Sequence, residues 1–145
     1  MPKSLKAYLS KKISASDFVI HYYIAGGFSG ATDFRLRGDG SYELCSNVTQ
    51  GHQKKSYSGQ LATLKVEQIA QKMLETRVWR VDHLYPTPAL DDAGARIVVE
   101  SASQKSEVVL WISEIRERPP FAAVQKQLLS LVHEVSAGEI LENGR

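Results

Sequence analysis

The sequence contains a single cysteine, Cys45, which excludes an internal disulfide and fits a reducing compartment. It also lacks any apolar stretch approaching the ~18 residues that a membrane-spanning helix needs. Residues 1–16 carry lysines but no apolar run of the length that a secretory signal requires. We therefore expect a cytoplasmic protein that does not associate with a membrane.

The sequence also lacks a strong charge of either sign. The 18 Lys and Arg residues against 16 Asp and Glu residues leave a net charge of +2. A dedicated nucleic-acid binder presents a stronger positive field. Basic residues gather at Lys3, Lys6, Lys11 and Lys12, but they are spread along a short arm, where we expect them to be solvated. We therefore expect no nucleic-acid partner.

Motifs that bind metals are absent from the local sequence. The four histidines, His21, His52, His83 and His133, stand far apart along the chain. His133 is followed by Glu134 but lacks the second histidine of the helical zinc motif. We expect no metal and no cofactor.

Two residues resemble nucleophiles at first sight. Ser29 lies between glycines, as in the nucleophile elbow of α/β-hydrolases, but that elbow leads into a helix. Here the residues after Ala31 alternate as a strand. Cys45 lies mid-strand with no neighbouring histidine, so we expect it to pack as a small buried residue. We predict that the protein is not an enzyme.

The length of 145 residues is the commonest size of one domain. We predict three parts: an N-terminal arm or short helix (1–16), a single α+β domain (17–138) and a C-terminal tail (139–145). The sequence leaves the oligomeric state open.

Alternating apolar and polar residues predict strands in the first half of the domain. The alternation is clearest at 18–24 and at 32–37. Gly38-Asp39-Gly40 supplies a tight turn, so 41–47 is expected to return as the paired strand. A weaker strand follows at 56–61, in which Gly59 is a candidate bulge.

The second half predicts two amphipathic helices around a hairpin. Val66 begins one apolar stripe, with Thr63 as its N-cap, and Pro119-Pro120 opens the final helix. The apolar runs at 96–101 and 107–113 predict central strands that are covered on both faces or share one face with a partner. The predicted fold is an antiparallel β-meander sheet packed by two helices, in the order ββββ-α-ββ-α.

Aromatic residues outside the stripes need a separate explanation. Trp79, Tyr85 and Trp111 are expected in the core, and the paired carboxylates Glu114 and Glu117 are expected to be solvated. Phe28 differs because it lies between glycines in a loop, where a large apolar side chain must find either the core or a partner. The residues alone leave both interpretations of Phe28 open.

The segment Ile24-Ala25-Gly26-Gly27-Phe28-Ser29-Gly30, the charged hairpin turned at 38–40 and the amphipathic helix ending in Trp79 resemble the emfourin family of small bacterial proteins. The resemblance covers roughly 18–135. It implies a protein-binding module that inhibits thermolysin-like metalloproteases, zinc enzymes that favour a bulky apolar side chain beside the cut. The residues implied to contact the partner are Gly26, Gly27, Phe28, Ser29 and Gly30.

Two alternatives remain open. One is a small-ligand or enzymatic site between sheet and helix, involving His21, Tyr23, Asp91 and Asp92. The other is a structural or assembly role, in which paired sheets bury the two-sided strands around Ile97 and Val109.

Overall fold

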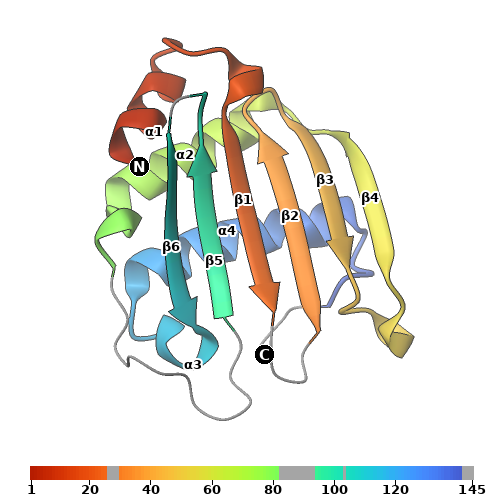
Figure 1. Cartoon of the computed structure of the whole chain (residues 1–145). Coiled ribbons are helices and arrows are strands. Elements are labelled where there is room, and N and C mark those ends of the chain that lie inside the picture. Colours follow the sequence, from red (N-terminus) through yellow and green to blue (C-terminus); the bar gives the residue numbers. More distant parts are fainter. Residues whose placement is uncertain (26–29, 82–93, 103, 142–145) are drawn as a thin grey trace.

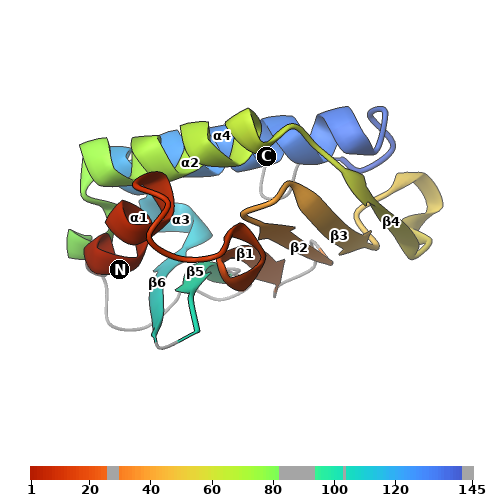
Figure 2. The same cartoon turned by 90° about the horizontal axis from the view of Figure 1, so that it is seen from above.

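A computed structural model describes residues 1–25, 30–81, 94–102 and 104–141 of the chain. These residues form one antiparallel sheet in the order β4-β3-β2-β1-β5-β6 with helices packed on one face (Figures 1 and 2). The strands are β1 (Val19–Ala25), β2 (Ala31–Arg37), β3 (Ser41–Ser46), β4 (Lys55–Gln60), β5 (Gly94–Glu100) and β6 (Lys105–Trp111). The helices are α1 (Pro2–Leu9), α2 (Thr63–Thr76), α3 (Ile112–Ile115) and α4 (Pro119–Val135), with short 3₁₀ turns η1 (Ala15–Asp17), η2 (Gln50–His52) and η3 (Val78–Arg80).

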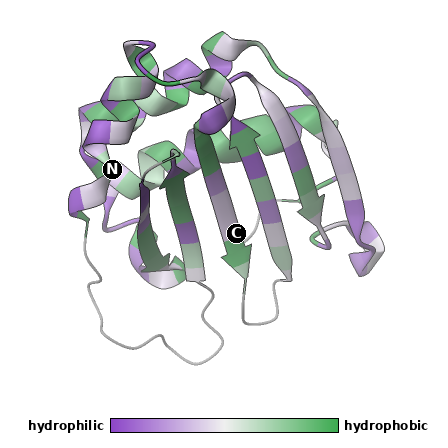
Figure 3. Cartoon of the chain, turned by 45° about the horizontal axis from the view of Figure 1, so that its top comes forward, coloured by the Kyte–Doolittle hydropathy of each residue, from purple (hydrophilic) through white to green (hydrophobic). Residues whose placement is uncertain are grey.

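Strand β1 lies in the middle of the sheet and joins its two halves. It pairs with β2 from Val19↔Arg37 to Ala25↔Ala31, and with β5 from Val19↔Glu100 to Ala25↔Gly94. Its residues alternate between buried and half-buried, as a sheet with one covered face requires. Figure 3 shows hydrophobic and hydrophilic residues alternating along β2.

The core lies between the covered face of the sheet and the helices α2 and α4. Both helices lie on the same side of the sheet (Figure 2), and they contact each other. Each of them buries one stripe of side chains. The buried apolar residues of the stripes are Val66, Ile69, Ala70 and Met73 in α2, and Phe121, Val124, Leu128, Leu129, Leu131 and Val132 in α4.

The predicted α+β class, the antiparallel sheet and the packing of helices against it are confirmed. The predicted element order differs because α1 precedes the first strand and α3 follows the last.

Among the described residues, no helix has both the length and the apolar character needed to cross a membrane.

Three local predictions are wrong. Helix α2 begins at Thr63 itself, with Ala62 as its N-cap and no capping hydrogen bond from a side chain. Gly59 marks no bulge, because β3 and β4 pair in continuous register. An added Cβ there would lie 2.8 Å from the Tyr42 hydroxyl, so the glycine makes room for that ring. Strand β6 is an edge strand, and it ends at Trp111 instead of continuing to Ser113.

The N-terminal residues pack onto the body through α1. Leu5 and Tyr8 are buried, and the Tyr8 ring stacks on Phe18 with ring centroids 4.2 Å apart and planes 3° apart. The Tyr8 hydroxyl donates a 2.7 Å hydrogen bond to the Gly38 carbonyl oxygen. Helix α1 is therefore fixed to the β2–β3 turn as well as to the start of β1.

Residues at the start of the expected tail, 139–145, also contact the body. The structure describes 139–141, and Ile140 is buried. Ile140 forms an antiparallel bridge with Thr49, and the Leu141 amide donates to the Val48 carbonyl at 2.7 Å. This segment is therefore held against the connection between β3 and β4.

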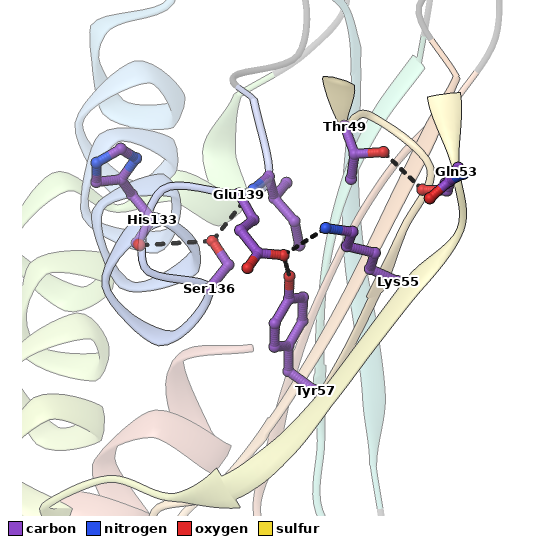
Figure 4. A network of polar contacts seen from close by, with 8 residues as sticks. Thr49, Gln53, Lys55, Tyr57, His133, Ser136 and Glu139 are labelled. Carbon is purple, nitrogen blue, oxygen red and sulfur yellow. Dashed lines mark hydrogen bonds and ion pairs between the residues drawn. The ribbon is translucent and has the colours of Figure 1, made fainter. Parts of the chain in front are cut away.

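A polar cluster holds the same segment against β4 (Figure 4). Glu139 Oε2 accepts from Lys55 Nζ at 2.6 Å and from the Tyr57 hydroxyl at 2.8 Å. These two hydrogen bonds hold the pKa of the Glu139 carboxyl below its ordinary value. The carboxylate is therefore the charged acceptor of the cluster.

We predict that Tyr8→Phe lowers the free energy of unfolding by about 1–3 kcal/mol, because it leaves the buried Gly38 carbonyl without its donor. Urea unfolding at neutral pH measures the effect. A change within error of zero would mean that water replaces the donor.

The same variant is expected to change the pH dependence of stability. Burial, with smaller contributions from Glu67 and Asp39, raises the pKa of Tyr8 to about 12. The unfolded tyrosine titrates near ~10, so the stability that this shift supplies is complete below pH ~10 and is lost as the pH rises through about 12. Urea unfolding from pH 9 upward should show the advantage of the native protein over Tyr8→Phe shrinking; a constant difference would contradict the shift.

Candidate functional site

The predicted partner-binding loop is described only at its end. Gly26, Gly27, Phe28 and Ser29 lie outside the described residues, and Gly30 lies within them. Gly30 has φ +83°, a left-handed backbone that favours glycine. An added Cβ would lie 2.5 Å from Asn47 Oδ1. Position 30 therefore requires glycine both for its backbone and for the approach of Asn47.

A set of hydrogen bonds fixes the chain where this loop joins β2. The Ala31 amide donates to Asn47 Oδ1 at 2.8 Å, and the Asn47 amide donates to the Ala31 carbonyl at 3.2 Å. The Ser46 hydroxyl donates to the same carbonyl at 3.1 Å and lies 2.7 Å from the buried Thr32 hydroxyl. On the other side, Ala25 pairs with Ala31 in the β1–β2 register. Both ends of the loop are thus held by the sheet.

A small hollow of about 190 Å³ adjoins this junction. Ala31, Ser46 and Asn47 form one part of its lining, and Lys54 supplies a cation. The lining residues are Ala31, Asp33, Cys45, Ser46, Asn47 and Lys54. The hollow therefore lies where the loop joins β2.

The residues of the alternative ligand site lie elsewhere than expected. His21 and Tyr23 alternate with the buried residues of β1, so they face away from the helices and not into a space between sheet and helix. Asp91 and Asp92 lie outside the described residues. Instead, His21 Nε2 lies 2.7 Å from Asp33 Oδ1 on the neighbouring strand. The structure thus brings together a histidine and a carboxylate that the sequence did not pair.

Cys45 is half-buried on this outward face, and not in the core as expected. It lies opposite Asp33 in β2 and Ser56 in β4, and the Ser56 hydroxyl donates to its sulfur at 3.6 Å. Asp33 separates it from His21, and among the described residues the thiol has no hydrogen bond to an imidazole that could accept its proton. Within the described ranges, no group of three or more metal-ligating side chains is found.

The open depression around Cys45 has a volume of about 430 Å³ and a charged lining. Asp33 and Glu43 are each already bonded to another side chain, His21 and Arg37 respectively. Besides Cys45 and Tyr57, whose hydroxyl is bonded to Glu139, the lining offers Arg35 and the hydroxyls of Ser56 and Ser58. These groups can hydrogen-bond a polar molecule, but the surface is open to solvent.

Other predicted residues have mixed outcomes. Trp79 packs partly buried against the core, whereas Trp111 lies on the outward face, where its ring covers Gly94. Tyr85 lies outside the described residues. Glu114, expected in solvent, is fully buried and accepts the Trp111 amide proton at 2.8 Å. Its carboxylate ends β6 by starting α3, in the manner of an acidic residue in the first turn of a helix.

Sequence reasoning missed Asn47 and Ser46, which fix the loop junction. The only sequence signal for them is the hairpin register, because Ser46 is the partner of Thr32 and Asn47 follows it.

Models of known protein families were compared with the chain, and none matches; a comparison with curated proteins likewise found no match. The resemblance to the emfourin family therefore stays a prediction.

We predict that Gly30→Ala destabilises the protein more than Gly51→Ala does. Both glycines have left-handed backbones, with φ +83° and +82°, so each variant has a strain of about 1–2 kcal/mol. No atom lies within 4 Å of a Cβ at Gly51, whereas at Gly30 it displaces Asn47 from the Ala31 amide, which adds about 1 kcal/mol. Urea unfolding of the matched pair measures the difference, and equal losses would mean that Asn47 does not hold the junction.

Proposed function

We propose that this protein is a protein-binding module that presents the Gly26–Gly30 loop to its partner. The observation that carries the proposal is the fixed junction of the loop, with Ala25 paired to Ala31 and Gly30 set against Asn47. A loop with restrained ends loses less conformational entropy when it binds. Binding energy from a single aromatic side chain can then dominate a small interface.

We propose further that the partner is a thermolysin-like metalloprotease, inhibited when Phe28 enters the site that accepts a bulky apolar side chain. The support for this partner is the resemblance of the Gly-Gly-Phe-Ser-Gly segment to the emfourin family. The hollow beside Asn47 would receive a side chain of the protease next to the loop. The proposed role is binding and not catalysis.

Small-ligand binding is the second candidate. The depression lined by Arg35, Ser56 and Ser58 favours it, because its hydroxyls and guanidinium provide donors for a polar molecule. Its openness to solvent argues for weaker binding than the largely enclosed sites that hold most ligands.

We predict that the intact protein inhibits a thermolysin-like protease in a titration with a fluorogenic peptide substrate. Phe28→Ala is expected to weaken inhibition at least tenfold, because truncation of a central aromatic anchor costs about 2 kcal/mol or more. Leu64→Ala is the matched control, since Leu64 is an exposed apolar residue on α2, remote in sequence from the loop.

Two outcomes would count against the proposal. Proteolysis that is unchanged at high micromolar excess of folded protein would remove the inhibitor role. Equal losses for Phe28→Ala and Leu64→Ala would show that the loop is not the contact. In the second case a pull-down with the native protein and Phe28→Ala tests whether any other protein depends on the ring.

A further inference from the structure

A second hollow lies between the N-terminal helix and the end of α2, on a part of the molecule that the loop does not include. Its volume is about 380 Å³. Helix α1, the last turn of α2 with its C-cap, and η3 each contribute side chains to it. The lining residues are Pro2, Lys6, Leu74, Arg77, Trp79 and Arg80. Figure 1 shows these elements together at the side of the molecule where the chain begins.

The charges of this hollow have one sign. Lys6, Arg77 and Arg80 are basic, and no acidic residue belongs to the lining. In the described part of the chain, none of the three has a side-chain hydrogen bond or ion pair. By contrast, Arg37 and Arg96 on the sheet are each paired with a glutamate. An anion in the hollow would therefore meet cations that no described acidic side chain neutralises.

The backbone places the two arginines on the same side. Arg77 is the C-cap of α2, in a left-handed conformation with φ 55° and ψ 47°. The chain then turns directly into η3, and the Arg80 amide donates to the Arg77 carbonyl at 2.9 Å. Both arginines belong to the lining of the same hollow. The two guanidinium groups thus leave the backbone toward one region.

The remaining lining is apolar. Leu74 and Trp79 are half-buried, and both pack against the core on one side. Pro2 adds an apolar ring from the first turn of α1. A ligand of purely ionic character would leave this surface in water, whereas an apolar body would bury it.

We propose that this hollow binds a small amphipathic anion, with its carboxylate or phosphate held by Arg77, Arg80 and Lys6 and its apolar body against Leu74 and Trp79. Guanidinium groups match the planar, two-oxygen geometry of carboxylates and phosphates. The volume falls in the range of roughly 300–1,000 Å³ that is usual for small-molecule sites. The proposal is independent of the role of the loop.

The test uses the full chain labelled with ¹⁵N and titrated with sodium octanoate and with octyl phosphate. The sequence has two tryptophans, Trp79 and Trp111, so their indole N–H signals report separately on the hollow and on the sheet. We expect a saturable shift of the Trp79 signal with both anions. Octyltrimethylammonium, of the same chain length and opposite charge, should cause none.

Substitutions identify the groups that hold the anion. Arg77→Asn keeps a residue that tolerates the left-handed C-cap, and Arg80→Gln keeps a polar side chain. Each is expected to weaken octanoate binding about tenfold, because each removes a charge-assisted hydrogen bond. Arg116→Gln changes another exposed arginine outside the hollow and should leave the affinity unchanged. Circular dichroism establishes that each variant is folded.

Four results would overturn the proposal. If neither millimolar octanoate nor millimolar octyl phosphate causes a saturable shift of the Trp79 signal, the hollow does not bind an amphipathic anion. Equal binding of octyltrimethylammonium, or unchanged affinity in folded Arg77→Asn and Arg80→Gln, would remove the role of the cations. Inorganic phosphate, titrated in the same way, should bind more weakly than octyl phosphate; equal affinity of the two would remove the role of Leu74 and Trp79.

Discussion

The pairing of β1 with both β2 and β5 is the interaction on which the rest of the structure depends. It joins the meander β1–β4 to the hairpin β5–β6, which helix α2 separates along the chain. A slip by one residue would turn Ile20, Tyr22 and Ile24 toward solvent and His21 toward the core. The same register brings Ala25 opposite Ala31 and Gly94, so it also fixes where the 26–30 loop leaves the sheet.

Local patterns predicted β1 to β3 and the two long helices because each element carries most of its apolar stripe within a short segment. The same patterns misassigned β6. Its apolar run continues through Ile112, and such a run indicates a strand covered on both faces. In the fold, Glu114 accepts the Trp111 amide proton and the chain turns into α3. That interaction depends on the burial of a carboxylate, which composition does not reveal.

The candidate site was predictable to a lesser degree. The sequence named Gly30 only as a residue implied to contact a partner, whereas its need to be glycine, set by its backbone and the approach of Asn47, depends on the pairing of β2 with β3. Cys45 was predicted as a small buried residue because it lies mid-strand with no neighbouring histidine, yet its place in the alternation turns it outward beside Asp33. The His21–Asp33 pair likewise depends on which strands are neighbours.

The arrangement of charge in space was the least predictable property, because the sequence gives the net charge but not which charged side chains are neighbours in the fold. On the outward face of the sheet, opposite charges neutralise one another in pairs such as Arg37 with Glu43 and Arg96 with Glu107. The three cations around the second hollow have no such partners in the described chain. Their combined charge of +3 exceeds the net charge of the whole sequence, +2, so the rest of the protein has a net charge of −1. A small overall charge argues against a nucleic-acid surface, but it leaves room for a local site that attracts a single anionic group.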